Sequence, residues 1–146
     1  MRDLFDFLLA PARFVPWRVA VLFGALLGLP LVSDNVVAMS GLVTPASRTG
    51  FGLAACFAAG ILGASRGREF HQGILAVFAA ILIANLIGLA GGMFAIRAAT
   101  LAGTISPSLV REATDLPLFG MLLLGLPVGT IGAGVGAWLS RRHTVA

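Results

Sequence analysis

This 146-residue chain has no lysine, no tyrosine and very little charge of either sign. Only 11% of its residues are charged, whereas about a quarter are charged in a typical soluble domain. Because 58% of the residues are hydrophobic, too few polar side chains remain to cover a surface that faces water. The composition therefore excludes an ordinary soluble domain and predicts an integral membrane protein whose first partner is the lipid bilayer.

The basic residues are all arginine, and they occur singly or in pairs. The net charge of +4 would indicate nucleic acid only if it were concentrated in a run or along one helix face. No such run exists, so we expect no nucleic-acid partner and attribute the charge to membrane topology. The single cysteine, Cys56, has apolar neighbours and can form no intrachain disulfide, which is typical of a small packing residue.

Sequence signatures of enzymes are also missing. His71 and His143 flank hydrophobic segments without the spacing of HExxH or CxxC motifs. Glu69 and His71 alternate in a short polar segment, but two candidate ligands do not make a metal site. The glycine-rich segment 132–138 follows no strand and lies in a hydrophobic run, unlike a dinucleotide-binding loop. We therefore expect no enzymatic activity, no metal and no other cofactor.

Four hydrophobic segments are long enough to cross a bilayer as α-helices, for which about 20 residues are needed. Thr44-Pro45 supplies the start of the second one, as an N-cap followed by proline at the first helical position. The prediction is an all-α, integral membrane four-helix bundle that forms one transmembrane domain over residues 19–142, followed by a tail of residues 143–146. The predicted spans cover residues 19–39, 45–65, 71–96 and 116–139.

Residues 1–18 precede the first span and are expected to lie in the membrane interface. Leu4 and Leu8 fall on one side of a helix while Asp3 and Asp6 fall on the other, which is the pattern of a short amphipathic helix. The segment is short for an isolated helix, so a disordered tail is the alternative.

Four spans place both ends of the chain on the same side of the membrane. Seven arginines then lie on that side and three on the other, namely Arg48, Arg97 and Arg111. By the positive-inside rule, both termini face the cytoplasm. The predicted location is the cell (inner or cytoplasmic) membrane, as a multi-pass protein.

Small residues recur at spacings of three and four in each predicted span. Such spacings line one side of a helix, and small residues let helices approach closely in lipid, where apolar burial adds little. These surfaces serve either to pack the four helices of one chain or to form a seam for self-association or gating. The predicted helix-packing glycines are Gly24, Gly28, Gly52, Gly63, Gly88, Gly92, Gly125, Gly129, Gly132 and Gly136.

Few polar side chains occur inside the predicted spans. Asp34 lies near the far end of the first span, and we predict that it pairs with Arg97 or Arg48 at that side of the membrane. Asn85 lies near the middle of the third span, where we expect a hydrogen bond to another helix. The intramembrane polar residues are Asp34, Asn35, Asn85 and Thr130.

The segment GILGASRGREFHQGILAVFAAILIANLIG, residues 60–88, resembles small four-span membrane proteins of unknown function from bacteria and archaea. The shared features are a glycine-rich span, a short turn of arginine and glycine, and a second span rich in small residues. The resemblance implies a four-helix fold and implies neither an activity nor site residues.

Three functions follow as hypotheses. The first is a structural or accessory role without catalysis, as a homo-oligomer or a subunit of a larger membrane complex. The alternative is a small transporter or channel with a polar path near Asn85 and Thr130, between helices kinked at Pro30 and Pro127. A transport path needs several polar groups at mid-depth, so the structural role is preferred. A membrane enzyme comes third, because clustered acids, bases or metal ligands are missing.

Overall fold

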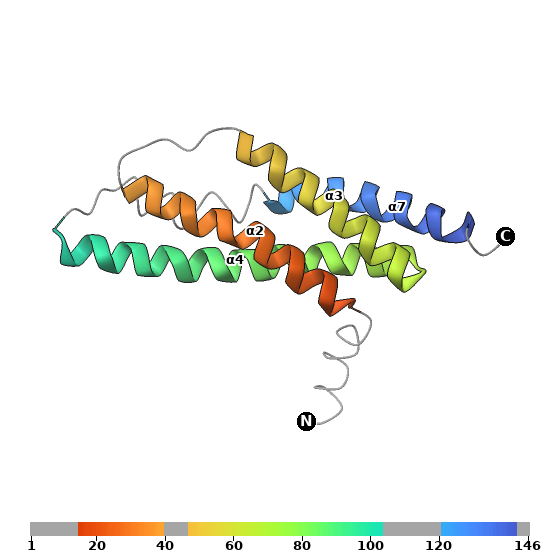
Figure 1. The fold of residues 1–146 in the computed structure, drawn as a ribbon, viewed down its shortest axis with the longest axis horizontal. Coiled ribbons are helices and arrows are strands. Elements are labelled where there is room, and N and C mark those ends of the chain that lie inside the picture. Colours follow the sequence, from red (N-terminus) through yellow and green to blue (C-terminus); the bar gives the residue numbers. More distant parts are fainter. Residues whose placement is uncertain (1–14, 40–46, 104–120, 143–146) are drawn as a thin grey trace, which may run out of the picture.

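The computed structural model describes residues 15–39, 47–103 and 121–142, without the side chains of residues 34–39, 47–49 and 142. This part of the chain is helical apart from short connections, and it contains no strand. The helices are α2 (Trp17–Met39), α3 (Ser47–Gly67), α4 (Phe70–Leu101) and α7 (Leu126–Arg142), with a π-helical turn, η2 (Met121–Gly125), directly before α7 (Figure 1). The prediction of an all-α fold is confirmed for these residues.

Several predictions fall outside the described residues. They concern the amphipathic segment before residue 15, the helix start at Thr44-Pro45, the beginning of the fourth span at residues 116–120, and the tail at residues 143–146. Each of them stays a prediction.

Helices α3 and α4 form an antiparallel hairpin closed by a tight turn. Arg68 in this turn has a φ angle of 58°, in the left-handed region. One turn before the end of α3, a Cβ atom on Gly63 would lie 2.7 Å from the Cβ of Ala76 and 3.1 Å from the Cα of Gly73. Small residues on both helices therefore bring the two arms of the hairpin close together.

Helix α2 packs along α4 in the same direction. Gly24 faces Ile83, and four residues later on both helices Gly28 faces Ile87. Since residue numbers rise together on the two helices, α2 and α4 are parallel. The α2–α4 interface is also the most extensive one between any two of the described helices.

Helices α3 and α7 are parallel as well. Gly132 faces the carbonyl group of Phe57, and Gly136 faces that of Ile61. Consecutive helices are thus antiparallel and alternate helices are parallel (Figure 1). The beginning of α2, the α3–α4 turn and the end of α7 consequently lie at the same end of the bundle.

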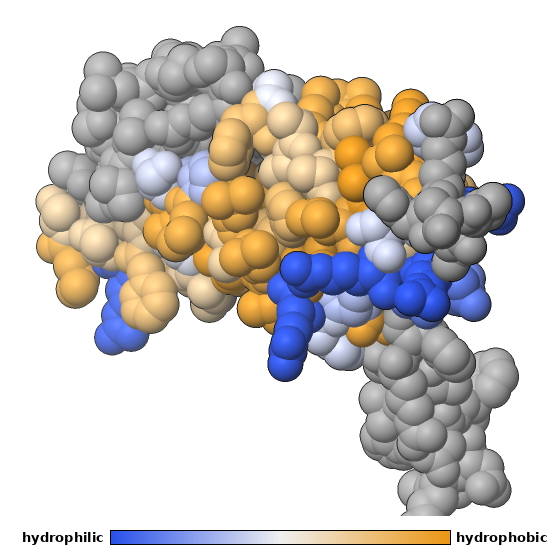
Figure 2. Space-filling model, turned by 45° about the vertical axis from the view of Figure 1, so that its right-hand side comes forward, coloured by the Kyte–Doolittle hydropathy of each residue, from blue (hydrophilic) through white to orange (hydrophobic). Residues whose placement is uncertain are grey.

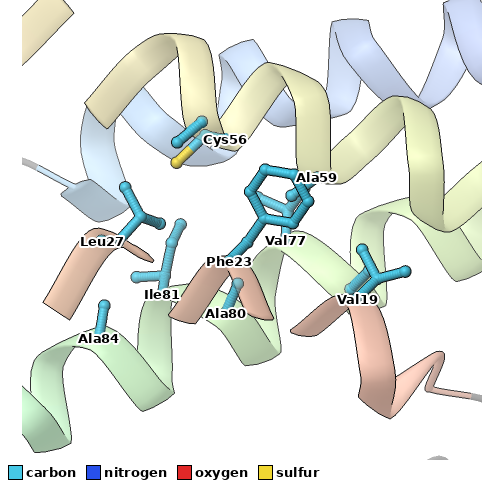
Figure 3. Close-up of a cluster of buried hydrophobic side chains, with 11 residues drawn as sticks. Val19, Phe23, Leu27, Cys56, Ala59, Val77, Ala80, Ile81 and Ala84 are labelled. Atoms are coloured by element: carbon cyan, nitrogen blue, oxygen red, sulfur yellow. The ribbon is translucent and has the colours of Figure 1, made fainter. Parts of the chain in front are cut away.

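Small side chains fill the interior, and large apolar side chains lie outside. The largest fully buried side chains belong to Leu27, Ile81, Val19, Val77 and Cys56, and most other buried positions are alanine or glycine. Figure 3 shows how they meet, with Leu27 from α2, Cys56 from α3 and Ile81 from α4 pointing toward one another. Many leucine and phenylalanine side chains are instead exposed on the outer surface, where they form a large apolar area.

Three of the described helical segments are long and apolar enough to cross a membrane, namely Gly50–Gly67, Phe70–Leu101 and Met121–Arg141. The apolar part of α2 is shorter and covers Trp17–Ser33. Helix α4 extends past the predicted end at Ile96 through Arg97 to Leu101, because an arginine near a span end can remain helical while its charge reaches toward water. Length and hydropathy thus support three of the four predicted spans.

The two prolines predicted to kink their helices have different surroundings. Pro30 lies inside α2, which continues to Met39. Pro127 follows the π-helical turn η2. Proline has no N–H group, so the carbonyl of Leu123 loses its regular partner four residues later, and the backbone before Pro127 departs from α-helical spacing. The irregularity lies ahead of Pro127, in the π-helical turn that directly precedes α7.

Candidate functional site

Three helices meet at a point that we call the glycine junction, formed by Gly60 of α3, Gly73 of α4, and Gly129 and Ala133 of α7. A Cβ atom on Gly60 would overlap the carbonyl oxygen of Gly129 and lie 2.8 Å from the amide nitrogen of Ala133. A Cβ atom on Gly73 would lie 2.6 Å from the Cβ of Ala133 and 2.8 Å from the carbonyl oxygen of Gly60. The helices can meet this closely only because Gly60 and Gly73 lack side chains.

The same backbone contact continues along α3 and α7 beyond the junction. A Cβ atom on Gly132 would overlap the carbonyl oxygen of Phe57, and one on Gly136 would overlap that of Ile61. Such close approach permits Cα–H···O contacts between the helices. This face of α7 is therefore occupied by α3 of the same chain.

The other two predicted glycines of α7 also face helices of the same chain. A Cβ atom on Gly125 would lie 3.0 Å from the Sγ of Cys56 and 3.5 Å from the Cδ1 of Ile81. One on Gly129 would lie 2.5 Å from the Cγ1 of Val77. All four glycines of this face thus pack inside the chain, against α3 and α4.

The α2–α4 interface uses its glycines differently, as hollows for side chains. Cβ atoms on Gly24 and Gly28 would lie 2.6 Å and 2.8 Å from the Cβ atoms of Ile83 and Ile87. In the reverse direction, the Leu31 side chain reaches to 3.0 Å of the Cβ position of Gly88. Branched side chains of one helix therefore fill the spaces that glycine leaves on the other.

Gly52 differs from the other predicted packing glycines. It is only half-buried, and a Cβ atom there would meet nothing closer than 3.9 Å, from Leu27 Cδ2 and Met121 Cε. That is an ordinary van der Waals distance, so an alanine fits at Gly52 without displacing a neighbour. Gly92, by contrast, is buried.

Two glycines of the junction, Gly60 and Gly73, were not among the predicted packing glycines, although a Cβ atom on either would come too close to a neighbouring helix. Two rows of small residues run side by side on α3, one through Ala55, Ala59 and Gly63 and the other through Cys56, Gly60 and Ala64. The predicted packing residue Gly63 lies on the first row, whereas Gly60 lies on the second. The second row had the same spacing of four, and that spacing was the signal for Gly60.

Asn85 is buried, with 6% of its surface exposed, and its Nδ2 donates a hydrogen bond to the carbonyl oxygen of Ile81 at 2.8 Å. The Oγ1 of Thr130 donates likewise to the carbonyl of Leu126 at 2.8 Å. Each of these groups thus donates a hydrogen bond to a carbonyl of its own helix one turn back. Among the described residues, Asn85 has this hydrogen bond within α4 and none to another helix, so the predicted bond between helices is not seen there.

Asn85 and Thr130 lie at different depths in the bundle. Gly129 faces Val77 on the antiparallel helix α4, so Thr130 lies about nine residues from the level of Asn85. At 1.5 Å per residue, this separation is about 13 Å along the bundle. The two polar groups do not converge on one site.

The charged residues of the predicted ion pair are only partly described. Arg97 is exposed on the last turns of α4, while the side chains of Asp34 and Arg48 lie outside the described set, so their pairing stays a prediction. In the α3–α4 turn, Glu69 Oε2 lies 3.0 Å from His71 Nε2. Among the described residues, no group of three or more His, Cys, Asp or Glu could hold a metal ion.

No protein-family model, curated protein or solved structure matches this chain.

Proposed function

We propose that this protein is an integral membrane protein with a structural or accessory role and no catalytic activity. In this proposal its four helices cross the bilayer and form a compact unit that associates with further copies or with other membrane subunits. The observation that carries the proposal is the distribution of side-chain size, with glycine and alanine inside and large apolar residues outside.

The exposed apolar side chains on the outer surface support the proposal that this surface faces lipid. Leu86, Met93 and Phe94 on α4 have 67%, 73% and 75% of their surface exposed. In water, so large an exposed apolar area drives aggregation, whereas in lipid it has no cost. Figure 2 shows this apolar surface (orange) extending over the body of the molecule, with hydrophilic side chains (blue) toward its margins.

The length of α2 supports a fourth crossing. Its 23 residues extend about 34 Å at 1.5 Å per residue, which matches a hydrocarbon core of about 30 Å. It also runs parallel to α4 along the most extensive interface of the bundle. A helix held beside α4 in this way shares the depth of α4 in the membrane.

The packing of α7 favours the structural role over a mobile seam. Its glycines are engaged by α3 and α4 of the same chain, so separating these faces would break the fold. Self-association in this proposal uses the outer surface of large apolar side chains. The transporter hypothesis has less support, because Asn85 and Thr130 each bond to their own helix and lie at different depths.

The topology is tested by labelling single cysteines with a membrane-impermeant thiol reagent, in a Cys56→Ala background. We expect Val15→Cys and Glu69→Cys to be labelled from the same side, which is the cytoplasmic one. Ala102→Cys, at the other end of α4, is labelled from the opposite side. If α2 does not cross, Val15→Cys reacts from the side opposite to Glu69→Cys, and the four-span proposal is wrong.

The structural role is tested by native mass analysis of the protein purified in mild detergent, with identification of every stoichiometric companion. We expect a defined homo-oligomer or a complex with another membrane subunit. A monomer without companions that carries solute across vesicle membranes would replace the structural role with the transport alternative. The Asn85→Ala variant then shows whether that flux depends on the predicted polar path.

A further inference from the structure

We propose that one end of the bundle binds the phosphate groups of anionic phospholipids. This end, called the arginine end below, carries Arg18, Arg66, Arg68 and Arg141. The inference rests on the membrane insertion proposed above and adds a preference for one class of lipid at one membrane surface.

The helix directions bring these arginines together from four places in the chain. Arg18 lies in the first turn of α2, Arg66 in the last turn of α3, Arg68 in the α3–α4 turn, and Arg141 in the last turn of α7. All four are exposed. Figure 2 shows blue side chains along the lower right of the molecule, where the apolar surface ends.

The arginine end has a strong excess of positive charge. Its described residues include one carboxylate, that of Glu69, against four guanidinium groups, which leaves a net charge of +3. Glu69 forms its ion pair with His71, at 3.0 Å, and not with an arginine. The opposite end has Arg97 as its one described charge. A surface of this sign attracts anionic headgroups.

The backbone of Arg68 gives independent support. Its φ angle of 58° lies in the left-handed region, where side chains of L-residues are crowded and where glycine is the default residue. Gly67 directly precedes Arg68, yet it is Arg68 and not this glycine that has the left-handed conformation. A non-glycine residue in this conformation is a candidate for a functional side chain.

Two tryptophans indicate the depth of these arginines in the bilayer. Trp17 and Trp138 have 49% and 52% of their surface exposed at this same end. Trp17 adjoins Arg18, and Trp138 precedes Arg141 by three residues, or about 4.5 Å along the helix. Exposed tryptophan side chains are typical of the headgroup level, where the anionic groups that a guanidinium meets are lipid phosphates, which it binds in a bidentate manner. This depth favours a lipid over a soluble acidic partner.

The test compares the full-length protein in mild detergent with two variants, using native mass analysis during titration with phosphatidylglycerol or phosphatidylcholine. The first variant combines Arg66→Gln with Arg68→Gly, and the control is Arg97→Gln at the opposite end. Each arginine near an anionic surface contributes roughly a fivefold change in affinity. Because the double variant loses two arginines, we expect it to bind phosphatidylglycerol roughly 25-fold more weakly. Binding of phosphatidylcholine is unchanged, and the control retains wild-type affinity.

Thermal unfolding of the same samples separates lipid binding from folding. Arg68→Gly alone should unfold at the same or a higher temperature, because glycine relieves the strained turn, while its affinity for phosphatidylglycerol falls. A purely structural arginine would lose stability instead.

Equal binding of both lipids, or a loss in Arg97→Gln as large as in the double variant, would overturn the inference. So would full competition by inorganic phosphate, which would indicate an anion site without a preference for lipid. If alkaline carbonate removes the protein from phosphatidylcholine vesicles, the protein is not inserted in the bilayer. In that case the proposed membrane role itself is wrong.

Discussion

The carbonyl oxygen of Gly129 occupies the space that a side chain on Gly60 would need. This contact joins α3 and α7, and Gly73 of α4 packs against the same point through Ala133. In lipid, where apolar burial between helices gains little, the fit of such surfaces supplies much of the association energy. The glycine junction should therefore be highly sensitive to a single added methyl group.

Gly60→Ala should destabilise the protein by about 1–3 kcal/mol, because the new Cβ atom forces α3 and α7 apart. The matched control is Gly50→Ala on the same helix, where a Cβ atom would meet nothing within 4 Å. The control should be neutral or should stabilise α3 by up to about 1 kcal/mol. Unfolding in mixed detergents, followed by circular dichroism, measures both, and equal stability of the two variants would contradict the contact.

Gly129→Ala should be rescued in part by Val77→Ala. The added methyl group collides with the Cγ1 and Cγ2 atoms of Val77, at 2.5 Å and 2.7 Å, and both atoms are absent from alanine. Each single change should cost about 1–3 kcal/mol, through overpacking or through a cavity. The double variant should be more stable than the sum of these costs predicts, by about 1 kcal/mol. Strict additivity in a double-mutant cycle would show that the two residues do not touch.

Asn85→Ala should change the free energy of unfolding by only about 0.6 kcal/mol, the average for polar contacts in comparable membrane helices. The reason is that the amide bonds to Ile81 of its own helix and holds no second helix in place. Detergent unfolding again measures the effect. Collapse of the bundle in this variant would reveal a contact between helices that the hydrogen bond to Ile81 does not explain.

The helical elements and their apolar character were predictable from the sequence, because hydropathy and the length of a bilayer crossing act over whole segments. Trp17–Met39 and Phe70–Leu101 contain the first and third predicted spans. The end of α4 was placed too early, because Arg97 was taken to stop the helix, whereas a helix can continue while a long side chain reaches toward water. The π-helical turn before Pro127 depends on how the backbone relaxes locally, and the sequence shows only the proline.

The sequence predicted that glycines would make close contacts between helices, but it did not predict which residues they would contact. Spacings of three and four identified the face of α7 that carries Gly132 and Gly136, while on α3 they allowed two rows, and Gly60 lies on the row that we did not choose. Gly52 has the right spacing, yet no helix lies against it closely enough to need glycine. The rotation of a helix about its own axis is set by its neighbours, and a periodic pattern alone does not determine it. The hydrogen bond of Asn85 likewise depended on which carbonyl lay nearest.

The most direct test of the account is the double variant Gly129→Leu with Gly132→Leu, with Gly134→Leu as its control. Gly134 is exposed on the same helix, and a Cβ atom there would meet only Phe70 Cε2, at 3.9 Å. Circular dichroism and native mass in mild detergent measure folding and oligomeric state together. The account predicts that the double variant fails to fold while the control folds like the wild type. A stable, folded monomer of the double variant would show that this face of α7 is a seam between copies and not the interior of the bundle.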